Sequence, residues 1–213
     1  MRLRNNPNAL KLLMEYEDVF VPKPQLLKGK WRGRFGNDNK ICAELGMGRG
    51  RFISTHAHND PDSNFIGIDV KDEVVLDAME RVAKLKLKNL VLIVSNIADI
   101  EEIFAPGELD TLFINFSDPW PKTRHAKRRL TNRLFLNKYK NVLKPGGYII
   151  FKTDSRELFD FSLNEFSECG FELVGVTYDL QSENDPANVV TEYENRFMKK
   201  GIPINRLIAR YNG

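Results

Sequence analysis

The sequence is poor in cysteine and histidine, on which disulfide-stabilised and zinc-binding proteins depend. Among 213 residues there are two cysteines, Cys42 and Cys169, and three histidines. Cysteines so few and so far apart form neither a disulfide framework nor a zinc ligand set, so we expect reduced thiols and a cytoplasmic protein. His56 and His58 stand two positions apart on a predicted helix and face different directions, so we expect no metal site.

Long hydrophobic runs are also missing. Nowhere do about eighteen uncharged apolar residues follow one another, and the N-terminal MRLRNNPNALKLLMEY contains no apolar signal-peptide core. We therefore expect neither secretion nor membrane insertion. The formal net charge of +3 is too small to imply nucleic-acid binding, so any such argument depends on where the cations cluster.

Alternating strand and helix patterns follow a basic leader at residues 1–39. Apolar strand-like runs occur at 40–45, 64–70, 89–96, 109–118, 147–154, 171–180 and 206–211. Helix-like stretches lie between them at 52–58, 72–85, 97–104, 131–143 and 155–170. This order predicts one doubly wound α/β domain over 40–213, with a mostly parallel sheet covered on both faces. The long segment 181–203 is expected to carry some helix and some function.

Polar side chains close five consecutive predicted strands: Glu44, Asp69, Asn96, Asp118 and Asp154. Ligands of such sheets bind outside the carboxyl ends of the strands. Each residue also has a structural explanation, since Asp69 and Asp118 could begin turns and Asp154 with Glu157 fits a helix capping box. As a set, they favour a polar ligand with several hydroxyl and amino donors.

A glycine turn, ELGMGRG, follows the first predicted strand and includes Gly46, Gly48 and Gly50. Missing Cβ atoms let a ligand approach the backbone there. The spacing is not the dinucleotide G-x-G-x-x-G, and Glu44 beside the turn would repel a pyrophosphate but attract an ammonium or sulfonium group. Asp69 can accept both hydroxyls of a ribose. These features favour S-adenosylmethionine over NAD, and a dehydrogenase is the weaker alternative.

The stretch NFSDPWPKTRHAKRR, residues 115–129, joins an acid, a stiff corner and five Lys or Arg. Prolines on both sides of Trp120 restrict the turn that follows Asp118. Trp120 either stacks on a base or packs in the core. The cations are either a solvated surface or a contact to a phosphate backbone. The leader cations Arg2, Arg4, Lys23, Lys28, Lys30, Arg32 and Arg34 either extend that contact or belong to a partly disordered leader.

Together the segments ELGMGRG, GIDV, NFSDPWPKTRHAKRRL, FKTDSRELF and TEYE resemble, in order and interval, the bacterial TrmB-type tRNA (guanine-N7)-methyltransferases. The resemblance spans nearly the whole chain. It implies a class I S-adenosylmethionine-dependent methyltransferase fold, Rossmann-like, with a seven-stranded sheet and helices on both faces. It also implies methylation of N7 of a guanosine in the tRNA variable loop, at position 46.

The resemblance further implies a role for individual residues. The catalytic residue would be Asp118. The cofactor would be bound by Glu44, Gly46, Gly48, Asp69, Asn96 and Asp118. The substrate would be held by Lys122, Asp154, Thr191, Glu192, Tyr193 and Glu194. RNA would be contacted by Arg124, His125, Ala126, Lys127, Arg128 and Arg129. The partner would be tRNA, without a membrane or a metal, and the protein would be a monomer or a homodimer.

Elementary chemistry agrees with this assignment. Guanine N7 is unprotonated at neutral pH, so its methylation needs no general base, and a carboxylate at Asp118 could stabilise the cation that develops on the ring. Asp154 and Glu194 could accept hydrogen bonds from guanine N1 and N2. Thr191 and Glu194 also fit a helix capping box, which would explain both without a ligand. Two alternatives remain: methylation of an exocyclic amino group of a base, and RNA binding without catalysis.

Overall fold

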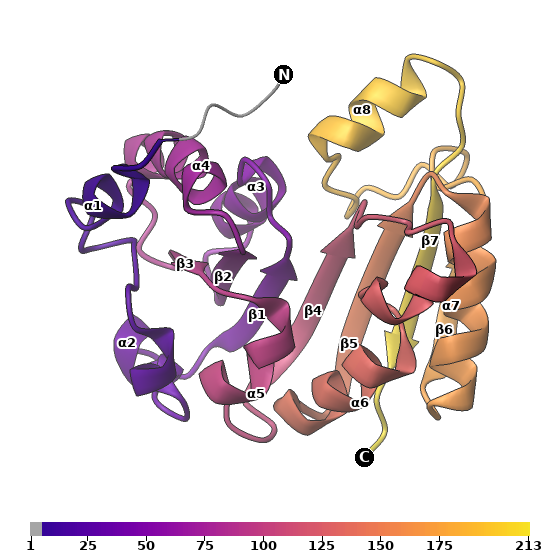
Figure 1. Cartoon of the computed structure of the whole chain (residues 1–213), viewed down its shortest axis with the longest axis horizontal. Helices are drawn as coiled ribbons and strands as arrows, with labels where there is room; N and C mark the ends of the chain where they lie inside the picture. Colours follow the sequence, from indigo (N-terminus) through magenta and orange to yellow (C-terminus); the bar gives the residue numbers. More distant parts are fainter. Residues whose placement is uncertain (1–5) are drawn as a thin grey trace. The chain divides into compact units, whose positions relative to one another are not determined.

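The chain forms two compact units, Met1–Ala105 and Pro106–Gly213, in a computed structural model that describes residues 6–213 (Figure 1). Within these described residues there are seven strands, ordered β3-β2-β1 in the first unit and β4-β5-β7-β6 in the second. The pairings inside each unit are parallel except those of β7 with β5 and β6. The predicted seven-stranded, mostly parallel α/β fold is therefore confirmed.

The first unit is built on three parallel strands. The strands are β1 (Lys40–Leu45), β2 (Ser63–Asp69) and β3 (Leu90–Val94). Its helices are α1 (Ala9–Leu13), η1 (Pro24–Leu27), α2 (Trp31–Phe35), α3 (Arg51–Asn59), α4 (Asp72–Leu85), η2 (Ile97–Asp99) and α5 (Ile100–Ile103). Buried residues fill β1 from Ile41 to Leu45 and β2 from Ser63 to Ile68, as expected of parallel strands covered on both faces.

Helix α4 illustrates how the sequence sets this layer. Its buried residues are Val74, Val75, Ala78, Met79 and Val82, spaced three and four apart as on one helix face. Asp72 and Glu73 stand in the first turn, where the helix dipole favours acids. The helix ends where Lys86 adopts a left-handed conformation, with φ of 51°. The helix thus covers β2 and β3 with its apolar face.

Much of the basic leader is folded in the described structure. The Trp31 side chain is fully buried and its Nε1 donates a hydrogen bond to the Ile103 carbonyl oxygen at 3.0 Å. Helix α1 packs on α4 through Ala9 and Leu13, both buried. Arg2 and Arg4 lie outside the described residues. The boundary at residue 39 stays a prediction.

The second unit is built on four strands. The strands are β4 (Leu109–Asn115), β5 (Leu143–Thr153), β6 (Glu172–Thr177) and β7 (Asn205–Arg210). Its helices are η3 (Thr123–Arg128), α6 (Arg133–Val142), α7 (Arg156–Glu168) and α8 (Glu192–Met198). Helices α6 and α7 pack against the strands, and α8 lies beyond the arrowheads of β4 and β5 (Figure 1). The long segment 181–203 thus carries the helix that the sequence predicts.

Helix starts in this unit are set by side-chain caps. Asn132 caps α6 by accepting from the Leu134 amide at 3.1 Å, and Ser155 caps α7 by accepting from the Leu158 amide at 3.2 Å. The capping box considered for Asp154 and Glu157 is therefore wrong, because the cap is one residue later. Within residues 6–213 no helix is long and apolar enough to cross a membrane.

Candidate functional site

The glycine turn after β1 leaves open space beside its backbone. Gly46 and Gly48 have φ of 78° and 54°, and a Cβ built on either meets no described atom within 4 Å. Gly50, with φ of 68°, differs because a Cβ there would come within 3.0 Å of the Ala78 Cβ. The first two glycines therefore give a ligand access to the backbone, whereas the third lets the turn pack against α4.

Asp69 closes β2 and is tied to the glycine turn. Its Oδ2 accepts a hydrogen bond from the Gly48 amide at 3.1 Å, and its Oδ1 accepts one from the Lys71 amide at 3.2 Å. Burial raises the pKa of Asp69 above its ordinary value, although these amide hydrogen bonds oppose the rise. Each carboxylate oxygen can accept one more hydrogen bond, which suits the two hydroxyls of a ribose.

Glu44 and Asn96 are the other two residues of the first unit that the sequence predicts to bind the cofactor. Glu44 lies in β1 opposite Gly67 of β2 and is only 2% exposed. Asn96 follows β3, and its Oδ1 accepts a hydrogen bond from the Ala98 amide at 2.9 Å. A buried acid, a second acid at a strand end and two open glycines fit the charge and shape of S-adenosylmethionine, which carries two cationic centres and no phosphate.

Backbone strain flanks Asp118 in the second unit. Phe116 and Trp120 have φ of 50° and 42°, a region that bulky residues rarely occupy. Such strain persists only where surrounding contacts fix it, and it concentrates at functional segments. Asp118 between them is exposed, and within residues 6–213 its carboxylate makes no hydrogen bond or ion pair. The loop thus presents an unneutralised acid on a rigid support.

Arg129 is the main support of this loop. Its Nε donates to the Pro119 carbonyl oxygen at 3.0 Å, and its Nη2 donates to the Trp120 carbonyl oxygen at 3.1 Å and to Glu157 Oε1 at 3.2 Å. The residue is 5% exposed, and its guanidinium lies over the Phe161 ring. The sequence predicts an RNA contact for Arg129, but a buried guanidinium that already binds these groups is not free for a phosphate.

The other cations of this stretch lie at the surface. Arg124, Lys127 and Arg128 of η3 are exposed, as is Lys122 before it, while His125 and Ala126 are half-buried. The Arg128 guanidinium lies 4.8 Å from the centre of the Trp120 ring, and His125 meets the same ring edge-on. Trp120 is itself half-buried, so it is not a core residue.

Asp154 follows β5 and is half-buried. Among the described residues its carboxylate has no hydrogen-bonding or ion-pair partner, so it can accept from a ligand. Tyr193 of α8 is 57% exposed and its ring stacks on that of Phe116, with centroids 5.9 Å apart. Glu192 beside it is half-buried. These are the side chains of the second unit suited to hold a base.

Thr191 and Glu194 form a capping box at the start of α8. Thr191 Oγ1 accepts from the Glu194 amide at 2.9 Å, and Glu194 Oε2 accepts from the Thr191 amide at 3.3 Å. Glu194 is fully buried, and its Oε1 accepts from Asn188 Nδ2 at 2.7 Å. Both carboxylate oxygens of Glu194 are thus already bound. The capping interpretation therefore replaces the hypothesis that Glu194 accepts hydrogen bonds from guanine.

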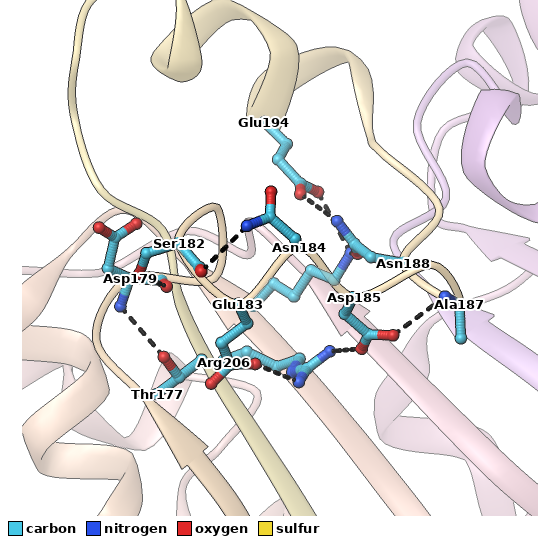
Figure 2. A network of polar contacts seen from close by, with 11 residues as sticks. Thr177, Asp179, Ser182, Glu183, Asn184, Asp185, Ala187, Asn188, Glu194 and Arg206 are labelled. Atoms are coloured by element: carbon cyan, nitrogen blue, oxygen red, sulfur yellow. Dashed lines mark hydrogen bonds and ion pairs between the residues drawn. The ribbon is translucent and has the colours of Figure 1, made fainter.

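Sequence reasoning missed two cations beneath this segment. Lys152 of β5 binds Asn188, Val189 and Glu194, and Arg206 of β7 binds Glu183 and Asp185. Figure 2 shows Glu194 extending toward Asn188, with Arg206 joined to Glu183 and Asp185. A lysine inside the apolar run GYIIFKTD was the available signal, because a buried strand position rarely carries an unpaired charge. Across residues 6–213 no cluster of three or more potential metal ligands occurs.

Sequence comparison matches nearly the whole length of the chain. The profile of a family described as "Putative methyltransferase" matches residues 38–207. A protein of Brevibacillus brevis named tRNA (guanine-N(7)-)-methyltransferase is 48% identical, covering 98% of each chain. A protein of the same name from Bacillus licheniformis is 46% identical, covering 99% of each chain.

Solved structures share the fold at low sequence identity. The 16S rRNA methyltransferase KamB superposes with a TM-score of 0.66 at 14% identity, covering 87% of this chain and 94% of that one. A SAM-dependent methyltransferase from Aquifex aeolicus gives a TM-score of 0.57 at 18% identity, covering 97% and 99%. These likenesses confirm the class I methyltransferase fold.

Proposed function

The chain belongs to the family of tRNA (guanine-N7-)-methyltransferases, and from this we propose the reaction that it performs. It transfers the methyl group of S-adenosylmethionine to N7 of a guanosine in tRNA, and the acceptor is position 46 in the variable loop. The observation that carries the proposal is the 48% identity over 98% of the chain to a relative of that name. The site also supports this reaction. The open glycines and Asp69 suit the methyl donor, and Asp118 offers a carboxylate for the charge that develops on the base.

Cofactor binding is assigned to the first unit. S-adenosylmethionine supplies an electrophilic methyl group on a sulfonium. The Glu44 carboxylate attracts the ammonium of its methionine part, and Asp69 accepts the ribose hydroxyls. The backbone of Gly46 and Gly48 allows close approach, and the Asn96 amide offers hydrogen bonds to the adenine.

Asp118 acts on the charge that appears during transfer. Guanine N7 carries a lone pair at neutral pH, so no residue has to remove a proton. Positive charge passes to the guanine ring, and a fixed carboxylate stabilises it by electrostatic preorganisation. Alignment of two bound reactants can lower a barrier by roughly 7–11 kcal/mol, so the site has to hold the methyl donor and N7 in line.

Base recognition is assigned to Asp154, Tyr193 and Lys122. Asp154 accepts from the N1 and N2 donors of guanine, which adenine cannot supply together. The exposed Tyr193 ring offers a stacking surface, and base stacking contributes about 1–3 kcal/mol per base. Lys122 pairs with a nearby phosphate of the substrate or donates a hydrogen bond to one of its carbonyl oxygens. Arg124, Lys127 and Arg128 contact the tRNA backbone. The enzyme acts in the cytoplasm, where its tRNA substrate is found, as a monomer or a homodimer.

The direct test is methyl transfer from labelled S-adenosylmethionine to an unmodified tRNA transcript. The product is digested to nucleosides, and the methylated position is mapped by mass spectrometry. We expect 7-methylguanosine at position 46 and its loss with Asp118→Ala. Methyl groups on an exocyclic amine would support the amino-methyltransferase alternative. Binding of tRNA without any transfer would reduce the protein to an RNA-binding module.

A further inference from the structure

Two neighbouring cations of the sheet hold the segment Glu183–Glu194 in place. Lys152 of β5 and Arg206 of β7 are paired in the antiparallel register, so their side chains leave the same face of the sheet. Lys152 binds Glu194 at the C-terminal end of the segment, and Arg206 binds Glu183 and Asp185 at its N-terminal end. Three carboxylates of one segment are thus bound to two adjacent strands.

Lys152 is the more deeply buried of the two cations, with a side chain 3% exposed. Its Nζ donates to Asn188 Oδ1, to the Val189 carbonyl oxygen at 3.1 Å and to Glu194 Oε2 at 3.2 Å. Glu194 is itself fully buried. A buried ion pair gives little net stability, but removing one partner is strongly destabilising because it leaves the other charged and desolvated.

The same residue also holds the loop that carries Asp118. The Lys152 carbonyl oxygen accepts a hydrogen bond from the Phe116 amide at 2.9 Å. The Phe116 ring then stacks on Tyr193 and Phe197 of α8, with centroids 5.9 Å and 6.2 Å apart. Lys152 therefore contacts two segments. Its carbonyl oxygen binds Phe116 at the strained start of the Asp118 loop, and its ammonium binds Glu194 in the first turn of α8.

From these contacts we propose that Lys152 is a positioning residue for substrate. Its ammonium fixes α8 so that the exposed Tyr193 ring stays stacked on Phe116 beside the Asp118 loop. The inference rests on the proposed function, in which Tyr193 and Asp118 act on the target base. Arg206 is a second anchor for the same segment, and its contact with Asp185 lowers the pKa of that carboxyl.

The test compares Lys152→Met with Lys144→Met, a matched control on the same strand. Lys144 also pairs with a largely buried acid, Asp110, but at the opposite end of β5. Both variants are assayed at a temperature at which circular dichroism shows them folded. We expect Lys152→Met to lower kcat/KM for tRNA at least tenfold, with the Kd for S-adenosylmethionine unchanged within twofold. Lys144→Met should change neither quantity beyond twofold.

A double variant separates positioning from stability. Lys152→Met with Glu194→Gln removes the uncompensated carboxylate, so its melting temperature should recover toward wild type. Asn188 and Val189 still lack the ammonium, so kcat/KM for tRNA should stay low. Recovery of both quantities, or equal kinetics in the two single lysine variants, would overturn the proposal.

Amide hydrogen exchange gives a readout that does not depend on turnover. Amides of α8 should exchange faster in Lys152→Met than in wild type, and at the wild-type rate in Lys144→Met. An inactive wild-type protein would refute the proposed function, whereas unchanged exchange of α8 in Lys152→Met would refute the anchor.

Discussion

Replacing the buried Arg129 by methionine tests whether this cation supports the loop that carries Asp118 or contacts RNA. Methionine is similar in length and apolar, but it lacks the guanidinium, which donates to the carbonyl oxygens of Pro119 and Trp120 and lies over the Phe161 ring. Hydrogen bonds from charged donors contribute about 1.5–3 kcal/mol each. Pro119 is exposed and Trp120 half-buried, so water can replace part of this contribution and the lower end of that range applies.

The expected loss of unfolding free energy is therefore about 3 kcal/mol for the two hydrogen bonds. The ion pair with Glu157 adds at most about 1 kcal/mol, because the Glu157 side chain is 69% exposed. For a chain of this length, a total loss of about 3–4 kcal/mol corresponds to a fall in melting temperature of roughly 6–16 °C. We also expect a lower kcat, since the strained loop around Asp118 loses its main support.

Arg128→Met is the matched control for this experiment. Arg128 is the preceding residue and is exposed, and its guanidinium lies over the Trp120 ring, so its removal should change stability by about 1 kcal/mol or less. It should weaken tRNA binding and reduce the slope of log affinity against log salt by about one unit.

Urea denaturation followed by tryptophan fluorescence gives the stabilities, and tRNA titrations at several salt concentrations give the slopes. We expect Arg129→Met to be less stable than wild type, with the salt slope of tRNA affinity unchanged. Arg128→Met should have wild-type stability and a reduced salt slope. An Arg129→Met protein with wild-type stability and a reduced salt slope would refute the structural role of Arg129.

Three further outcomes follow from the site. In the proposed function the ionised Asp69 carboxylate accepts the ribose hydroxyls, so affinity for S-adenosylmethionine should be full above its raised pKa and fall as the pH drops through it. Calorimetry across that range should show this pH dependence in wild type and not in Asp69→Asn. Gly67→Ala would bring a Cβ within 2.4 Å of Met47 Sδ, so it should destabilise the protein by about 1–3 kcal/mol and weaken cofactor binding. Gly33→Ala, whose added Cβ meets no described atom within 4 Å, should do neither in the same thermal and calorimetric assays. Tyr193→Ala should raise the KM for tRNA by about tenfold through lost stacking, measured beside Tyr148→Ala, which should not.

The positions of strands and helices are predicted well from the sequence, because the patterns that indicate them involve residues close together in the chain. Strand β1 (Lys40–Leu45) and helix α4 (Asp72–Leu85) have the predicted bounds, since apolar runs and three- and four-residue spacing depend on neighbours in the chain. Ser155, not Asp154, caps α7, because cap choice is decided by backbone geometry that the pattern leaves open.

Side-chain roles that depend on distant partners were not predictable in this way. Glu194 could read a base or cap a helix, and its partner Lys152 stands 42 residues earlier in the chain. Arg129 looks like its exposed neighbours in sequence, yet it lies under the Pro119–Trp120 corner and reaches Glu157, 28 residues later. Only tertiary structure separates a buried cation that shapes a loop from a surface cation that meets RNA.

The central claim is that methyl transfer occurs at a ring nitrogen of one guanosine and needs no general base. Its most direct measurement uses a tRNA transcript in which position 46 alone carries 7-deazaguanosine, compared with the parent and with a transcript substituted at another guanosine. We predict that binding is retained in all three, and that transfer of labelled methyl is lost only with the substitution at position 46. Undiminished methylation of that transcript would contradict the account.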